Sequence, residues 1–165
     1  MKLLILIGGP MGVGKTAVSR ELQRRLSRCA FLDGDWCWDM RPFVVNDDTK
    51  TMVMDNIRCV LNGFLRCAEI ENIVFCWVMH EQAIIEGILT GLERNDAEVY
   101  VFSLIADEAA LTSRIRGDIA RGVRQPDVLA RSIAYLPKYG NLDTVKIDTS
   151  QRSIAETAEA ILRHL

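Results

Sequence analysis

A glycine-rich stretch near the start of the chain has the spacing of a phosphate-binding loop. Residues 9 to 16 read G-P-M-G-V-G-K-T, which fits G-x-x-x-x-G-K-[ST]. Glycines let the backbone curl so that its N–H groups point at phosphate oxygens. We expect the Lys15 ammonium to reach the β- and γ-phosphates of ATP and the Thr16 hydroxyl to bind Mg²⁺. The residues expected to hold the nucleotide are Gly9, Pro10, Met11, Gly12, Val13, Gly14, Lys15, Thr16 and Ala17.

Two aspartates separated by one glycine follow the second apolar run of the chain. Asp33, Gly34 and Asp35 come directly after Phe31 and Leu32. A solvated turn is one interpretation, since Asp and Gly favour turns. The position at the end of an expected strand, beside a phosphate loop, favours a functional role for both carboxylates.

Positive charge gathers in the segment between the fourth and fifth apolar runs. Two glycines, Gly117 and Gly122, lie among these arginines and indicate a segment that can move. A solvated helix face is the alternative to a cationic lid that closes over phosphates. The arginines concerned are Arg114, Arg116, Arg121 and Arg124.

Several large side chains are candidates for contact with a second substrate. Trp36 follows the aspartate pair, where it could stack on a ring, and packing in the core is the equal alternative. Arg41 and Arg58 are candidates for holding an anionic group, against solvated or internally paired roles. His80 follows the third apolar run, where it could contact substrate, cap a helix or pack.

Strand-like and helix-like segments alternate along the chain. Five apolar runs indicate strands at residues 2–7, 29–32, 72–78, 98–104 and 144–148. Helical periodicity is seen at 15–28, from the cap at 46–48 to 64, at 84–92, at 109–116, after Pro126, and at 153–165. This pattern predicts a three-layer α/β/α sandwich around a five-stranded parallel sheet. Parallel crossovers would bring the polar strand ends to one edge, where ligands bind.

Composition and charge narrow the function further. The chain has 165 residues and a net charge of −2, with 49% hydrophobic and 25% charged residues. These values indicate one domain, residues 1–165, and argue against nucleic acid or an anionic membrane as partners. With no signal peptide or membrane-length run, we expect a cytoplasmic monomer or homodimer. The five cysteines lack C-x-x-C spacing, which favours free thiols.

These motifs resemble the nucleoside-monophosphate-kinase-like group of P-loop proteins, and within it shikimate kinase, gluconate kinase and adenylylsulfate kinase. The resemblance implies a P-loop NTPase fold with a small lid at about residues 116–126. It implies that Asp35 orients or deprotonates the accepting hydroxyl and that Asp33 lies near the Mg²⁺ water shell. Arg116, or less favourably Arg114, would stack on the adenine, and Arg124 would neutralise the transferring phosphoryl. The segment from Thr149 to Arg152 is similar to the loop beside the base.

The chain also departs from that group. Trp77 to His80 stand where shikimate kinases carry a Gly-Gly pair, and no arginine occurs from Tyr135 to Tyr139. Shikimate itself is therefore not the expected acceptor.

The sequence leads to the hypothesis of an ATP- and Mg²⁺-dependent kinase. Its acceptor would be a small molecule such as a nucleotide, a nucleoside or a sugar-like compound. Lys15, Asp35 and Arg124 are the expected catalytic residues. A P-loop ATPase, or a regulatory nucleotide-binding protein without an acceptor, is the alternative.

Overall fold

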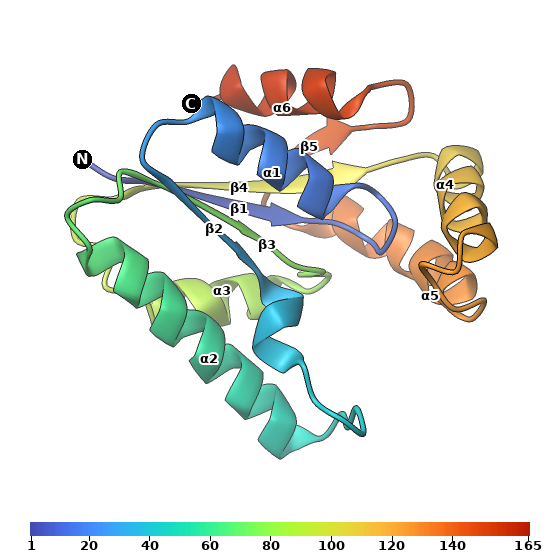
Figure 1. Ribbon diagram of the computed structural model, residues 1–165, viewed down its shortest axis with the longest axis horizontal. Helices are drawn as coiled ribbons and strands as arrows, with labels where there is room; N and C mark the ends of the chain where they lie inside the picture. Colours follow the sequence, from blue (N-terminus) through green and yellow to red (C-terminus); the bar gives the residue numbers. More distant parts are fainter.

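The computed structural model describes all residues from 1 to 165. Strands, α-helices and two 3₁₀ helices (η1 and η2) alternate along the chain (Figure 1). In order they are β1 (Leu3–Gly8), α1 (Lys15–Arg25), β2 (Cys29–Asp33), η1 (Gly34–Trp38), α2 (Asp47–Arg66), β3 (Asn72–Cys76), α3 (Gln82–Thr90), β4 (Glu98–Ile105), α4 (Glu108–Ala120), α5 (Val128–Tyr135), η2 (Leu136–Asn141), β5 (Val145–Asp148) and α6 (Ile154–Leu162).

The five strands form one parallel sheet in the order β2-β3-β1-β4-β5. The central strand β1 pairs on one side with β3 and on the other with β4, so that Ile5 lies opposite both Val74 and Tyr100. All strands point the same way, so their carboxyl ends share one edge. The predicted five-stranded parallel sheet is confirmed.

The sheet is buried on both faces, which explains the continuous apolar runs of its strands. Alternate side chains of β1 enter different cores: Leu4 and Leu6 on one face, Ile5 and Ile7 on the other. Helices α2 and α3 cover the first face, and α1 and α6 cover the second (Figure 1). The predicted three-layer arrangement is therefore confirmed.

The long helix α2 begins where the sequence predicts. The Asn46 side chain accepts a hydrogen bond from the Thr49 N–H, and Thr49 bonds back to the Asn46 N–H. One face of the helix is buried, and each such side chain contributes about 1.5–3 kcal/mol; its members are Val53, Ile57, Leu61 and Leu65. None of the helices has both the length and the apolar character that crossing a bilayer requires.

Helix α4 is longer than predicted. The periodic pattern indicated an end near residue 116, with the lid following, but the helix continues through Gly117 to Ala120. A glycine inside a helix lowers the stability of that helix by only about 1 kcal/mol relative to alanine. The backbone hydrogen bonds of the other residues in the helix offset this cost. The non-helical part of the expected lid is thus confined to the connection between α4 and α5.

Candidate functional site

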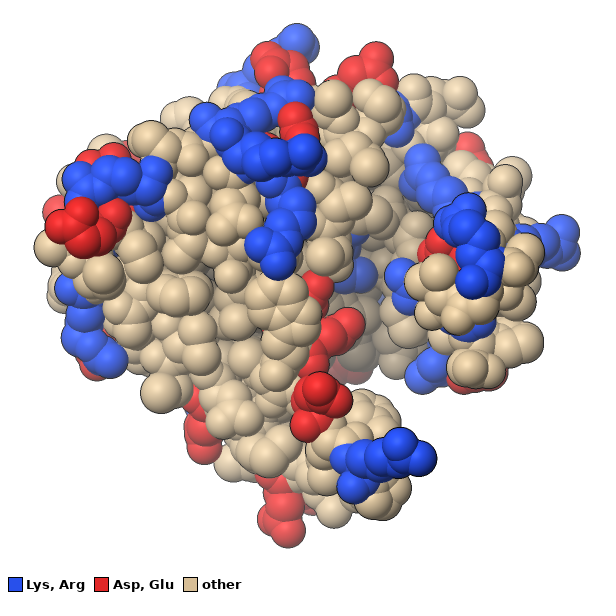
Figure 2. Space-filling model, viewed as in Figure 1, with Lys and Arg blue, Asp and Glu red and all other residues tan.

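A cavity of about 840 Å³ lies at the carboxyl edge of the sheet. Figure 2 shows it as a hollow between the body of the molecule and the lobe made by α4 and α5, with basic side chains on that lobe. A volume of this size suits a nucleotide-sized ligand. Its lining comes from the phosphate loop, the ends of β2 and β5, α4 and the start of α6: residues 11–18, Asp33, Asp35, Ser113, Arg114, Gly117, Asp118, Arg121, Arg124, Thr149, Arg152, Ser153, Ile154 and Thr157.

The phosphate loop needs glycine for two physical reasons. Gly12 has a φ of +82°, and a Cβ there would lie 2.5 Å from Cγ1 of Ile115. Gly14 has a φ of +107° and is the N-cap of α1. The loop therefore leads directly into a helix N-terminus, where free N–H groups and the helix dipole favour an anion.

The Lys15 ammonium is half-buried at the centre of the loop. Its Nζ donates to the carbonyl oxygens of Gly9 and Pro10, at 2.8 and 2.9 Å. Burial lowers the Lys15 pKa to about 8, while Cys76, Asp35 and Asp33 oppose this change. A cation held by neutral carbonyls is stabilised strongly by an added anion, so the loop fits the triphosphate of ATP.

Thr16 and Asp33 form an oxygen-rich pair beside Lys15. The Thr16 hydroxyl donates to Oδ2 of Asp33 at 2.7 Å, and Asp33 is 7% exposed. The other carboxylate oxygen of Asp33 accepts the Asp35 N–H at 3.1 Å. Hydroxyl and carboxylate oxygens are the ligands that Mg²⁺ prefers, so this donor set fits the expected metal.

Asp35 lies further out on η1 and opens into the same cavity. Its Oδ1 accepts a hydrogen bond from the indole N–H of Trp77 at 3.2 Å. Partial burial and the Asp33 charge raise the pKa of the Asp35 carboxyl, while Lys15 opposes the rise. A carboxylate with a raised pKa next to a phosphate loop is suited to accept a proton from a hydroxyl.

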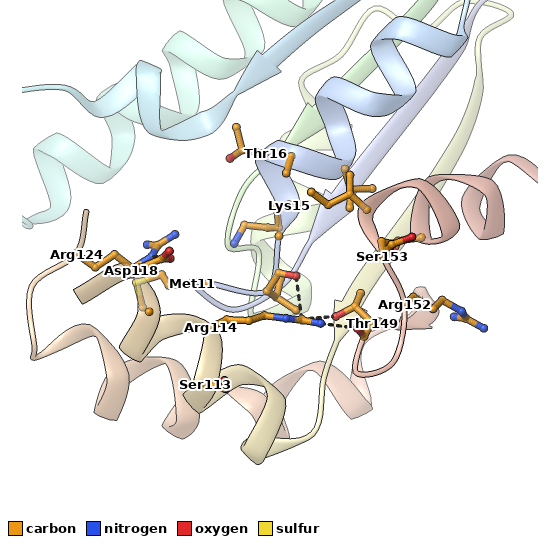
Figure 3. Close-up of a pocket in the computed structure, with 18 of the residues that line it drawn as sticks. Met11, Lys15, Thr16, Ser113, Arg114, Asp118, Arg124, Thr149, Arg152 and Ser153 are labelled. Carbon is orange, nitrogen blue, oxygen red and sulfur yellow. Dashed lines mark hydrogen bonds and ion pairs between the residues drawn. The ribbon is translucent and has the colours of Figure 1, made fainter. Parts of the chain in front are cut away.

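Arg114, rather than Arg116, is the arginine of α4 that reaches the nucleotide cavity. Arg114 donates to the hydroxyl and carbonyl oxygens of Thr149, at 2.9 and 2.6 Å, and to the Val13 carbonyl at 3.5 Å (Figure 3). Arg116 lines a separate depression on the outer side of α4. The structure therefore does not bring Arg116 to the phosphate loop.

The periodicity of α4 carries a signal for this arrangement. Leu111 and Ile115 are buried, and residues three or four positions apart share a helix face. That face includes Arg114 and Asp118, because Arg114 lies only about 60° around the helix from Leu111, whereas Arg116 lies about 140° from it. Anchoring the helix on its buried residues would have favoured Arg114.

Asp118 is a cavity residue that the sequence interpretation missed. Its two carboxylate oxygens bind Nε of Arg124 at 2.9 Å and Nη2 of Arg121 at 2.6 Å. Both arginines line the cavity (Figure 3 labels Arg124 and Asp118 side by side). The ion pairs hold Arg124 on the lobe side of the cavity.

The loop after β5 forms the remaining wall. Thr149 is buried at 3% exposure and lines the cavity, as do Arg152 and Ser153. Arg152 donates to the Asp148 carbonyl at 2.8 Å. Arg114 therefore joins this loop to the phosphate loop, and both expected residues of the base loop, Thr149 and Arg152, lie beside them.

Two expected substrate residues have structural partners elsewhere. Arg58 donates from Nε and Nη2 to the Gly87 carbonyl, at 2.9 and 2.7 Å, and pairs with Asp55. It ties α2 to α3 and does not line the cavity, which corrects the substrate-binding expectation in favour of internal pairing. The His80 ring stacks on Tyr135 at 4.4 Å, and burial lowers its pKa. It too lies outside the lining of the cavity.

Trp36 and Arg41 are both on the surface. Trp36 is 53% exposed, with its ring edge-on to Phe31 and under the Arg20 guanidinium. Arg41 is exposed in the segment between η1 and α2. Neither lines the nucleotide cavity, so the structure does not bring either expected substrate residue to it.

The fold and the site together define a P-loop kinase-like α/β protein: a phosphate loop between β1 and α1, and an aspartate pair after the neighbouring β2. The chain belongs to the AAA domain family, whose profile matches residues 5–130. A search of curated protein sequences gave no match.

Solved structures of small-molecule kinases and a resistance protein share this fold. The Deinococcus radiodurans tunicamycin resistance protein is 21% identical, with 99% of this chain and 95% of that chain covered and a TM-score of 0.72. A Sinorhizobium meliloti gluconokinase is 18% identical, with 97% and 91% covered and a TM-score of 0.68. An Acinetobacter baumannii shikimate kinase in complex with shikimate is 22% identical, with 99% and 92% covered and a TM-score of 0.64. The suspected relation to this kinase group is confirmed at the level of the fold.

Proposed function

We propose that this protein transfers the γ-phosphoryl group of ATP to a hydroxyl of a small-molecule acceptor. The observation that carries the proposal is the shared cavity of Lys15 and Asp35. The cavity has a cation for a triphosphate, and near it a carboxylate with a raised pKa. A protein that only binds nucleotide has no need of the second group.

In the proposed reaction the acceptor oxygen forms a bond to the γ-phosphorus as the bond to the β,γ-bridging oxygen breaks. ADP takes that electron pair and leaves, and the hydroxyl proton passes to Asp35 and then to water. Such transfers depend on positioning and charge stabilisation more than on covalent chemistry. Lys15 and the loop N–H groups would hold the triphosphate, and Arg124 would stabilise charge on the transferring group. Bound Mg²⁺, near Thr16 and Asp33, would offset phosphate charge.

The surface beyond Asp35 indicates which acceptors to test first. The protein has ten exposed large hydrophobic residues, and half of them fall between residues 36 and 52: Trp36, Phe43, Val44, Val45 and Met52. Clustered exposed apolar side chains commonly mark a binding surface. Arg58 already donates to the Gly87 carbonyl and pairs with Asp55, so it does not offer a cation for an anionic acceptor. The acceptor panel should therefore include hydroxyl compounds with an apolar face as well as nucleosides and sugars.

The experiment has two stages. Thermal shift with a nonhydrolysable ATP analogue, with and without each acceptor, identifies ligands by mass action. ADP formation with the hit is then compared between wild type and Asp35→Asn. We expect MgATP affinity to be retained and acceptor phosphorylation to fall about 10²–10⁴-fold.

Asp39→Asn is the matched control, because Asp39 is exposed four residues later and does not line the cavity. It should phosphorylate the acceptor as wild type does. Wild-type turnover in Asp35→Asn would remove the basis for a kinase. ATP hydrolysis that no acceptor accelerates would favour the alternative, a P-loop ATPase.

A further inference from the structure

Trp77 makes a polar contact that the phosphate loop and lid do not explain. It lies just after β3 and is 8% exposed, yet its indole N–H reaches Oδ1 of Asp35 at 3.2 Å. No other hydrogen bond of the Asp35 carboxylate is found. One oxygen is therefore held by the indole, and Oδ2 is left for another donor.

The glycine between the two aspartates gives the indole its place. A Cβ at Gly34 would lie 2.5 Å from Cγ and 2.7 Å from Cδ1 of Trp77. The ring therefore packs directly on the backbone of η1. Any side chain at position 34 would have to displace the indole from the Asp35 carboxylate.

From this contact we propose that Trp77 is a positioning residue for Asp35, fixing Oδ1 through its N–H so that Oδ2 faces the acceptor hydroxyl. The inference rests on the proposed function and adds a residue to it. An indole suits the task because it donates one hydrogen bond and carries no charge. An arginine or lysine would neutralise the carboxylate and weaken it as a base.

A second tryptophan, Trp38, packs beside Trp77 and provides a matched control. The Trp38 ring packs at 6.4 Å from the Trp77 ring, and its buried indole nitrogen has no hydrogen-bond partner. Trp77→Phe and Trp38→Phe thus remove the same atoms from neighbouring rings. Only the first removes a hydrogen bond to Asp35.

The first test needs no acceptor. Indole N–H signals in ¹⁵N–¹H spectra are assigned with Trp→Phe variants and compared between wild type and Asp35→Ala at one pH. We expect the Trp77 signal to move upfield in Asp35→Ala, because its hydrogen bond is lost, and the Trp38 signal to move much less. A Trp77 signal at the same position in both proteins overturns the inference without touching the kinase proposal.

The second test reads the consequence for turnover once an acceptor is known. In Trp77→Phe we expect kcat to fall about tenfold to a hundredfold, with KM for ATP unchanged. A loss of ATP binding together with kcat, or no loss in either, would contradict a positioning role.

Gly34→Ala approaches the same contact from the other side. It should lower kcat as Trp77→Phe does, because the added Cβ displaces the indole, even if Trp77→Phe folds poorly. Gly63→Ala, where a Cβ meets nothing within 4 Å, and Trp38→Phe should leave kcat as in wild type. A wild-type kcat in both Trp77→Phe and Gly34→Ala would show that the indole only packs.

Discussion

Lys15 should take up a proton when the protein binds ATP at mildly alkaline pH. Burial lowers the Lys15 pKa to about 8, below the usual value of about 10.4. The negative charge of a bound triphosphate favours the ammonium form and should return the pKa to its usual range or above. Binding between these two pKa values must then draw a proton from solution.

The size of the effect follows from the pKa of about 8. At pH 7 about nine-tenths of the free protein already carries the Lys15 proton, at pH 8 about half, and at pH 9 about one-tenth. Uptake on binding should rise from about 0.1 to about 0.5 and about 0.9 proton per ATP. The same linkage weakens the ATP affinity about tenfold between pH 7 and pH 9.

Isothermal calorimetry in pairs of buffers with different ionisation enthalpies measures this uptake directly. Lys15→Arg is the matched control, because a guanidinium keeps its proton throughout this range. Protons that the nucleotide itself exchanges are measured in Lys15→Arg as well, so the difference between the two proteins gives the uptake by Lys15. Equal uptake by wild type and Lys15→Arg at pH 9 would refute the assignment of a buried, deprotonated lysine to the phosphate loop.

Two further predictions concern the arginines. Arg124→Ala should lower turnover much more than MgATP affinity, because Arg124 is proposed to stabilise the transition state. Steady-state kinetics and direct binding measurements check this. Equal losses in turnover and affinity would make Arg124 a ground-state contact. Arg114→Ala should weaken MgATP binding by roughly tenfold, since the bonds that join the Thr149 loop to the phosphate loop are lost and charged hydrogen bonds contribute about 1.5–3 kcal/mol. Arg116→Ala is the control by calorimetry, and a larger loss there than in Arg114→Ala would contradict the arrangement of α4.

The two variants that test Asp35 and Trp77 answer different questions. Asp35→Asn asks whether the protein transfers phosphoryl groups at all. Trp77→Phe asks how the carboxylate is held, and its spectroscopic test succeeds or fails before any acceptor is known. The two tests can therefore fail separately. The protein could be a kinase in which Trp77 does not fix Asp35, or Trp77 could fix Asp35 in a protein that is not a kinase.

Local chemistry explains why so much of the site was predictable from the chain. The phosphate loop combines a required glycine spacing with a strand before it and a helix after it, and the structure has β1, the loop and α1 in that order. The Asn46 cap and the aspartate pair at the end of β2 are likewise short-range features. Buried apolar runs predicted the parallel sheet because both of its faces are covered.

The amino-acid sequence by itself thus determined the fold class and the residues that can meet a triphosphate, because those depend on neighbours a few positions apart. Only the tertiary structure decided which cations face the cavity. The rotation of α4 about its axis places Arg114 in the cavity and Arg116 on the outer side. The packing of α2 on α3 lets Arg58 donate a hydrogen bond to the Gly87 carbonyl. The tertiary structure also brought the Trp77 indole to Asp35 across 42 positions of the chain. Such contacts depend on sheet order and helix packing, which no local spacing specifies.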